Sequence, residues 1–175
     1  MTNTTGVTNQ PLLSYLKDHL AASVAALELI DHLKASANPF DGRRFLSVLR
    51  DEIAEDQQVL QTLVHDLGGA ESRVREAGAW LTEKFGELKL RVEDRRWNGL
   101  GHFEALETLA LGIQGKLALW TALEAVSDRV TETGKLDFPR LKQRARDQHA
   151  RVEGRRLEAA WKAFTTPRDG GIYDD

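Results

Sequence analysis

The chain has 175 residues, of which 41% are hydrophobic and 29% are charged, and its formal net charge at pH 7 is −3. These values are typical of a globular protein that can bury one hydrophobic core, and the negative charge does not favour nucleic acid as a partner. The absence of cysteine excludes disulfides, thiolate zinc sites and a cysteine nucleophile.

The two ends of the chain differ in composition from the middle. Residues 1–10 and 166–175 are polar and poor in apolar side chains, so we expect two disordered tails around a single domain at 11–165. The first ten residues lack the basic start and apolar stretch of a signal peptide. No window holds the roughly 20 apolar residues of a membrane span. We therefore expect a cytoplasmic protein without a membrane partner.

Apolar residues recur at steps of three and four in the first half of the domain, which predicts two amphipathic helices. The first begins near Pro11 and ends near Ala35, and its apolar positions are Leu13, Leu16, Leu20, Val24, Leu27 and Ile30. The turn sequence ASANPFDG follows. The second helix ends at Gly68-Gly69, a typical helix stop, and its stripe is Phe45, Leu49, Ile53, Asp56, Leu60, Leu63 and Leu67.

Residues 70–99 interrupt this pattern and predict one short helix followed by an extended piece. A third long helix follows, with the stripe Phe103, Leu106, Ala110, Ile113, Leu117, Trp120 and Leu123. After the turn TETGKLDFP, a fourth carries Phe138, Leu141, Ala145, Gln148, Val152, Ala159 and Ala163. No segment shows the apolar and polar alternation of a strand, so the sequence predicts an all-α domain.

The lengths of the connections predict how the four helices are arranged. Short turns join the first helix to the second and the third to the fourth, so each pair is expected to be an antiparallel hairpin. The connection at 70–99 is too long for a bundle turn, and it is long enough to cross the bundle from end to end. The third helix is then parallel to the second, in a four-helix bundle of two hairpins joined by one crossover.

This arrangement resembles the ferritin-like bundle superfamily, whose members include di-iron carboxylate proteins. The resemblance covers residues 11–165 and implies a four-helix fold of the same connectivity. In the di-iron members two helices each supply Glu and two supply Glu-x-x-His. No Glu-x-x-His occurs in this chain, so the resemblance implies the fold without the di-iron centre.

All four helices carry residues that could act as metal ligands of another kind. Eight residues qualify by type: Glu28, His32, Glu52, Asp56, Glu104, Glu107, His149 and Glu153. At 1.5 Å per residue, counting outward from the turns places those of the third and fourth helices at different levels. We therefore expect no cofactor and no metal, and the alternative is a metal-binding or di-iron carboxylate protein with atypical ligands.

Asp56 lies within the apolar stripe of the second helix. The same count places it level with Lys116, the one cation expected there, and near His19, Gln148 and His149. A buried carboxylate requires a cationic or hydrogen-bonding partner. Two interpretations follow: a polar core cluster that fixes how the helices pair, or a small-ligand site made of these five residues. Gly112 and Gly115 leave space nearby for a close neighbour or a ligand.

The fourth helix is strongly basic, with seven Lys and Arg residues between Arg140 and Arg156 against Asp147 and Glu153. Because it lacks interleaved aromatic residues, we expect a solvated face, or one that meets the acidic segment 51–56 within the chain or in a partner. Nucleic acid is not expected.

The expected function is non-enzymatic. We expect a protein-interaction or structural domain that forms a homodimer. The crossover carries Trp80, Phe85 and Trp97 outside the four stripes, and an apolar surface of this kind often marks a contact site.

Overall fold

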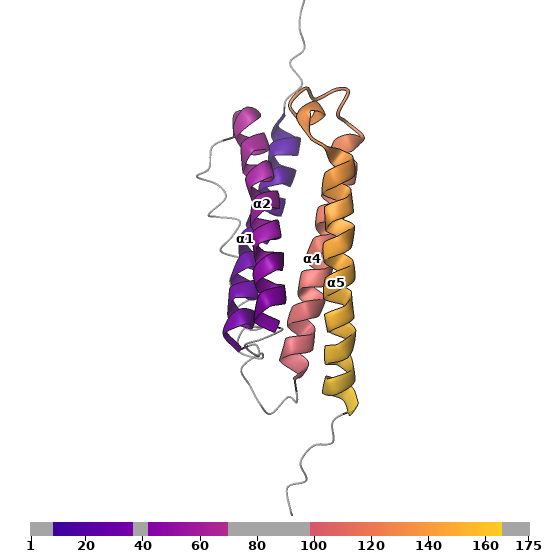
Figure 1. Cartoon of the computed structure of the whole chain (residues 1–175). Coiled ribbons are helices and arrows are strands. Elements are labelled where there is room, and N and C mark those ends of the chain that lie inside the picture. Colours follow the sequence, from indigo (N-terminus) through magenta and orange to yellow (C-terminus); the bar gives the residue numbers. More distant parts are fainter. Residues whose placement is uncertain (1–8, 37–41, 70–98, 166–175) are drawn as a thin grey trace, which may run out of the picture.

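The computed structural model describes residues 9–36, 42–69 and 99–165, and within these ranges its regular elements are all helical. Four long helices follow one another (Figure 1): α1 (Gln10–Ser36), α2 (Gly42–Asp66), α4 (Leu100–Glu124) and α5 (Phe138–Thr165), with a 3-10 turn, η3 (Thr133–Lys135), before α5. The predicted all-α class and the four long helices are confirmed. The two predicted tails and the predicted crossover lie outside the described residues, except for positions 9, 10 and 99. The crossover residues Trp80, Phe85 and Trp97 are among those outside.

The helix ends follow from local sequence. Gly68, just after α2, and Gly99, just before α4, have φ angles of 77° and 83°, a left-handed conformation that glycine adopts without steric penalty. At the start of α5 the Asp137 carboxylate accepts a 3.1 Å hydrogen bond from the backbone N–H of Arg140. This is the bond of a helix N-cap, and Pro139 occupies the first turn, where its missing N–H is tolerated.

Helices α1 and α2 form an antiparallel hairpin. Arg50 Nε donates to Asp31 Oδ1 at 2.7 Å, and Gln57 Nε2 donates to Ser23 Oγ at 2.9 Å. As the residue number rises along α2, the number of the partner on α1 falls. The short connection between them predicted this direction.

Helices α4 and α5 form the second antiparallel hairpin. Arg156 Nη1 donates to Glu107 Oε2 at 3.1 Å near one end, and Lys142 pairs with Glu124 near the other. Figure 1 shows α2 and α4 running in the same direction, as the sequence predicted. The 70–98 connection between them lies outside the described residues.

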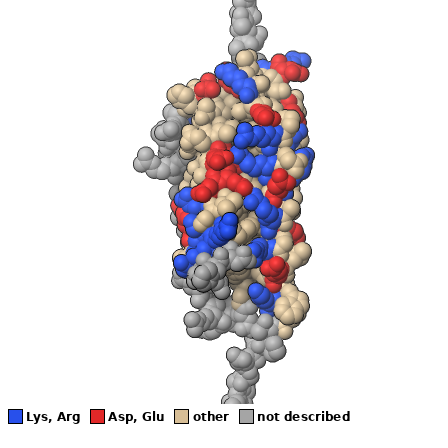
Figure 2. Space-filling model, in the orientation of Figure 1, with Lys and Arg blue, Asp and Glu red and all other residues tan. Residues whose placement is uncertain are grey.

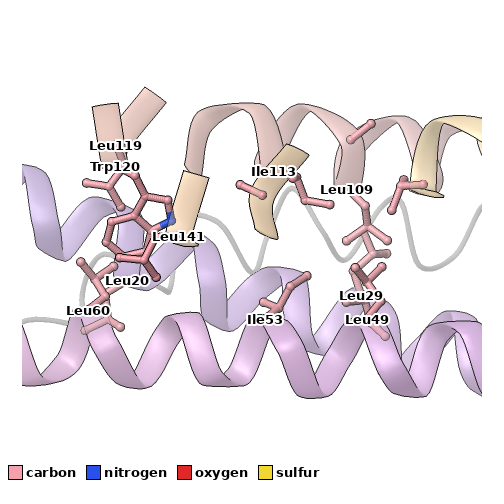
Figure 3. Packing of buried hydrophobic residues seen from close by; sticks show 14 of the residues in the cluster. Leu20, Leu29, Leu49, Ile53, Leu60, Leu109, Ile113, Leu119, Trp120 and Leu141 are labelled. Carbon is pink, nitrogen blue, oxygen red and sulfur yellow. The ribbon is translucent and has the colours of Figure 1, made fainter. Parts of the chain in front are cut away.

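The core runs along the bundle axis and consists of the apolar stripes of the four helices. Figure 3 shows Ile53 of α2 facing Ile113 of α4, and Trp120 of α4 beside Leu20 of α1 and Leu60 of α2. Burying large side chains of this kind contributes about 1.5–3 kcal/mol each, so the stripes account for the assembly of the helices. Among the helices of the described ranges, none is both long enough and apolar enough to cross a membrane.

Candidate functional site

Among the acidic residues that the structure describes, Asp56 alone is buried, with only 3% of its surface exposed. It lies on α2 between Ile53 and Leu60, which are both in the core. The helical period that directs these two residues inward directs Asp56 inward as well. A carboxylate in such surroundings is unfavourable unless hydrogen bonds and opposite charge compensate for its lost hydration.

Lys116 of α4 supplies part of this compensation. Its Nζ lies 2.5 Å from Asp56 Oδ2, and its side chain is 14% exposed. The contact expected from counting helix levels is therefore present. Burial lowers the pKa of Lys116 from its ordinary value, and the neighbouring Asp56 carboxylate opposes that shift.

Gln148 of α5 completes the link to the fourth helix. Its side chain is fully buried, its Oε1 accepts a hydrogen bond from Lys116 Nζ, and its Nε2 lies 3.4 Å from Asp56 Oδ2. One amide thus contacts both members of the ion pair. Because the cluster joins α2, α4 and α5, it holds the two hairpins in one register.

Arg144 of α5 is a second cation on Asp56, which corrects the expectation that Lys116 is the one cation at this level. Its Nη2 pairs with Asp56 Oδ1, and its Nη1 lies 2.7 Å from Glu55 Oε2. A signal for it exists in the sequence, because Arg144 precedes Gln148 by four residues and so shares its helix face. Counting levels missed it because the long guanidinium side chain reaches along the helix axis.

Further charge pairs join α5 to α2. Arg151 pairs with Glu52 one helical turn from Asp56, and Arg144 bonds to Glu55. Figure 2 shows basic and acidic side chains interleaved over this face of the molecule. The basic residues of α5 therefore meet the acidic segment of α2 within the chain, one of the two arrangements expected from the sequence.

The two histidines of the predicted cluster lie apart from Asp56's hydrogen-bonding partners. His19 of α1 packs edge-on against Tyr15, with ring centroids 4.7 Å apart. Burial lowers its pKa and Asp18 partly opposes this, so the ring is uncharged near neutral pH. His149 of α5 is half-buried, and Arg156 bonds to the carboxylate of Glu153 nearby on the same helix. The structure thus joins Asp56, Lys116 and Gln148 and leaves the histidines at the margin.

A pocket of about 220 Å³ lies beside the ion pair, between α1, α2 and α4. We call it the interhelical pocket. Its walls are mainly apolar, and its polar lining residues, apart from Trp120, are His19, Ser23, Asp56, Gln57, Thr108 and Lys116. An apolar cavity of about 150 Å³ in a protein holds benzene. The interhelical pocket is therefore large enough for a molecule of about nine non-hydrogen atoms.

Small residues keep the interhelical pocket open. Ala22 and Ala26 of α1 and Gly112 of α4 line it, and a Cβ built on Gly112 meets no described atom within 4 Å. Gly115 is equally uncrowded but is not among the pocket residues. The sequence-based idea that these glycines admit a closely packed neighbour is wrong for the described residues. The idea that they leave space for a ligand stays a prediction.

Trp120 brings a second polar feature to the interhelical pocket. Its side chain is 1% exposed, it lines the pocket, and its indole Nε1 has no hydrogen-bond acceptor among the described residues. In Figure 3 this nitrogen lies on the side of the ring that faces Ile53 and Ile113, which also line the pocket. Sequence analysis placed Trp120 in the apolar stripe and assigned no role to its N–H.

The eight candidate metal ligands are distributed along the bundle. Glu52 pairs with Arg151, while Glu107 and Glu153 both pair with Arg156. Within the described ranges, no three or more His, Asp or Glu side chains form a group that could hold a metal ion.

Comparison of the chain with models of known families, with curated proteins and with solved structures gives no match.

Proposed function

We propose that this protein is a non-enzymatic helical bundle that binds a small, mainly apolar molecule in the interhelical pocket. The observation that carries the proposal is the pocket itself, about 220 Å³ of space lined by three helices and bordered by the Asp56–Lys116 pair. A concave apolar site with a few fixed polar groups is the usual form of a small-molecule site.

The bonding of the polar groups supports binding rather than catalysis. Asp56 is held by two cations, and Lys116 is shared between Asp56 and Gln148. A general base needs a carboxylate within reach of a substrate proton, and a nucleophilic lysine needs an unprotonated amine. Both oxygens of Asp56 are engaged, one by Lys116 and one by Arg144, so neither is free to accept a substrate proton. The Asp56 carboxylate in turn opposes the loss of a proton from Lys116.

The experiment is a titration of the ¹⁵N-labelled protein with α-methylstyrene, a hydrocarbon of suitable size, followed by ¹H–¹⁵N NMR. We expect saturable shifts of signals from pocket residues. Gly112→Leu adds a bulky side chain at an exposed residue of the pocket lining and should abolish the shifts. Gly115→Leu, the same change three residues further along α4 and outside the pocket, should preserve them. The proposal fails if the wild type shows no saturable shift, or if the two variants respond alike.

A second candidate function, protein contact through a homodimer, is favoured by the exposed face of α5 near its C-terminal end. Leu157, Trp161 and Phe164 are 55%, 69% and 65% exposed, and their spacing places them on one side of the helix. We expect a dimer by light scattering that Trp161→Lys converts to a monomer. Leu111→Lys, at an apolar residue of α4 that is 67% exposed, should leave it unchanged. A wild-type monomer at micromolar concentration contradicts this candidate.

The ferritin-like arrangement also stays a proposal. Its support is the pair of antiparallel hairpins with α2 parallel to α4 (Figure 1). A crystal structure in which residues 70–98 run from one end of the bundle to the other would establish it. A connection that stays at one end would exclude it.

A further inference from the structure

Two residues on one face of α4 that line the interhelical pocket, Lys116 and Trp120, have side-chain hydrogen-bond donors. Trp120 Nε1 has no acceptor among the described residues. Lys116 Nζ has three N–H groups when charged, and Asp56 and Gln148 accept two of them. Lys116 and Trp120 are four residues apart, so they share a helix face with a rise of about 6 Å between them. Both line the pocket.

A buried donor without an acceptor is uncommon in folded proteins. Such a group has lost its hydrogen bond to water and gained none in return, which destabilises the fold. Trp120 is 1% exposed, so bulk water does not satisfy its N–H. The indole nitrogen can only donate. Its complement is therefore an acceptor, and a hydrocarbon or a group that only donates does not supply one.

The charge of the surroundings favours an uncharged acceptor. The cations Lys116 and Arg144 face the carboxylates of Asp56 and Glu55, so the formal charges cancel. The rest of the wall is mainly apolar. Among the described residues, an additional buried carboxylate or phosphate would find no unmatched cation there, and its dehydration would be unfavourable.

Resting on the proposed function, we infer that the ligand of the interhelical pocket is a neutral molecule with an oxygen acceptor, of the ketone, ester or ether class. Its oxygen accepts a hydrogen bond from Trp120 Nε1, and its apolar body fills the space beside Gly112 and Ile113. A ketone oxygen has two lone pairs, so the remaining N–H of Lys116 can also donate to it.

The experiment compares three probes of matched size in the full chain: acetophenone, the hydrocarbon α-methylstyrene, and benzoate. Dissociation constants are measured by NMR titration. One net hydrogen bond predicts that acetophenone binds the wild type about three- to tenfold more tightly than α-methylstyrene. We expect this ratio to fall to about one in Trp120→Phe, which keeps an aromatic ring and removes the N–H. Because any void left by Phe affects both probes alike, the ratio isolates the hydrogen bond.

A second measurement needs no variant. The Nε1–H resonance of Trp120 should move downfield with acetophenone and by much less with α-methylstyrene. Equal affinities for these two probes in the wild type would overturn the inference while leaving the pocket as a binding site. If benzoate binds most tightly, the inference is wrong and the pocket is an anion site at Lys116. If Trp120→Phe still binds acetophenone more tightly than α-methylstyrene by the wild-type ratio, the inference is also refuted. If no probe binds, the proposed function fails as well.

Discussion

Removing Asp56 and removing Lys116 should have unequal effects on stability, although the two form one ion pair. Asp56→Leu leaves Lys116 and Arg144, whose side chains are only 14% and 19% exposed, without the carboxylate that both contact. Stranding buried charge in this way typically destabilises by about 3–5 kcal/mol. Lys116→Met leaves Asp56 bonded to Arg144. It removes the hydrogen bonds from Lys116 to Asp56 and to Gln148 but strands no charge, so we expect a loss of about 1–3 kcal/mol.

The double variant Asp56→Leu with Lys116→Met should lose less than the sum of the two single losses, because Lys116 is then no longer left without its carboxylate and Arg144 still pairs with Glu55, 2.7 Å away. We expect a coupling free energy of about 1–3 kcal/mol between positions 56 and 116. Asp56→Asn keeps the size of the side chain and an acceptor oxygen, so its loss should be smaller than that of Asp56→Leu.

The assay is urea unfolding followed by circular dichroism, with the slope of the free energy against urea checked for constancy among variants. The exposed pair Asp31–Arg50 provides the matched control. Its atoms are 2.7 Å apart, but its side chains are 48% and 36% exposed. The same double-mutant cycle at Asp31 and Arg50 should give a coupling free energy of about 0.2–1 kcal/mol. The reasoning is refuted if coupling at 56 and 116 is no larger than in this control, or if Lys116→Met is as destabilising as Asp56→Leu.

Three further outcomes are expected. Purified without chelator, the protein should contain no stoichiometric iron, manganese or zinc by elemental analysis. One equivalent of metal that stays bound to the wild type and is lost in Glu52→Ala would contradict this. Burial and Lys162 lower the pKa of His102. As the pH falls from 7 to 5, the unfolded chain therefore takes up a proton at this position before the folded chain does, and the free energy of unfolding decreases. His102→Gln should weaken that fall in urea titrations, and an unchanged pH dependence would exclude the effect. Gly154→Ala, at an uncrowded position of α5, should stabilise by about 0.5–1 kcal/mol in urea; a loss would reveal a contact there.

The sequence alone was sufficient for the helices and for their directions. The apolar period marks α1, α2, α4 and α5 within a few residues of their observed bounds, because a helix directs every third or fourth side chain to one face. Asp56 could be recognised as buried by the same rule. Counting residues from the turns then brought it level with Lys116, since the rise per residue is constant along each helix.

Counting levels has a limit, which Arg144 and His149 illustrate. Asp56 is level with about residue 149 of α5 by this count, but the partner on that helix besides Gln148 is Arg144. A long side chain extends several ångströms along the axis. Side-chain direction around the helix also decides which of two adjacent residues faces inward: Gln148 is buried and His149 is half-exposed. Both properties lie beyond a count of Cα positions.

The interhelical pocket and the N–H of Trp120 were decided only by the tertiary structure. The sequence determined that Ile53, Ile113 and Trp120 belong to apolar stripes, because periodicity is a local property of each helix. A pocket is the volume left where side chains from α1, α2 and α4 do not fill the space between the helix axes. That volume depends on the rotation and separation of three helices at once, and no single helix encodes it. That Trp120 has no acceptor among the described residues likewise depends on its neighbours, which are set by how the two hairpins pack.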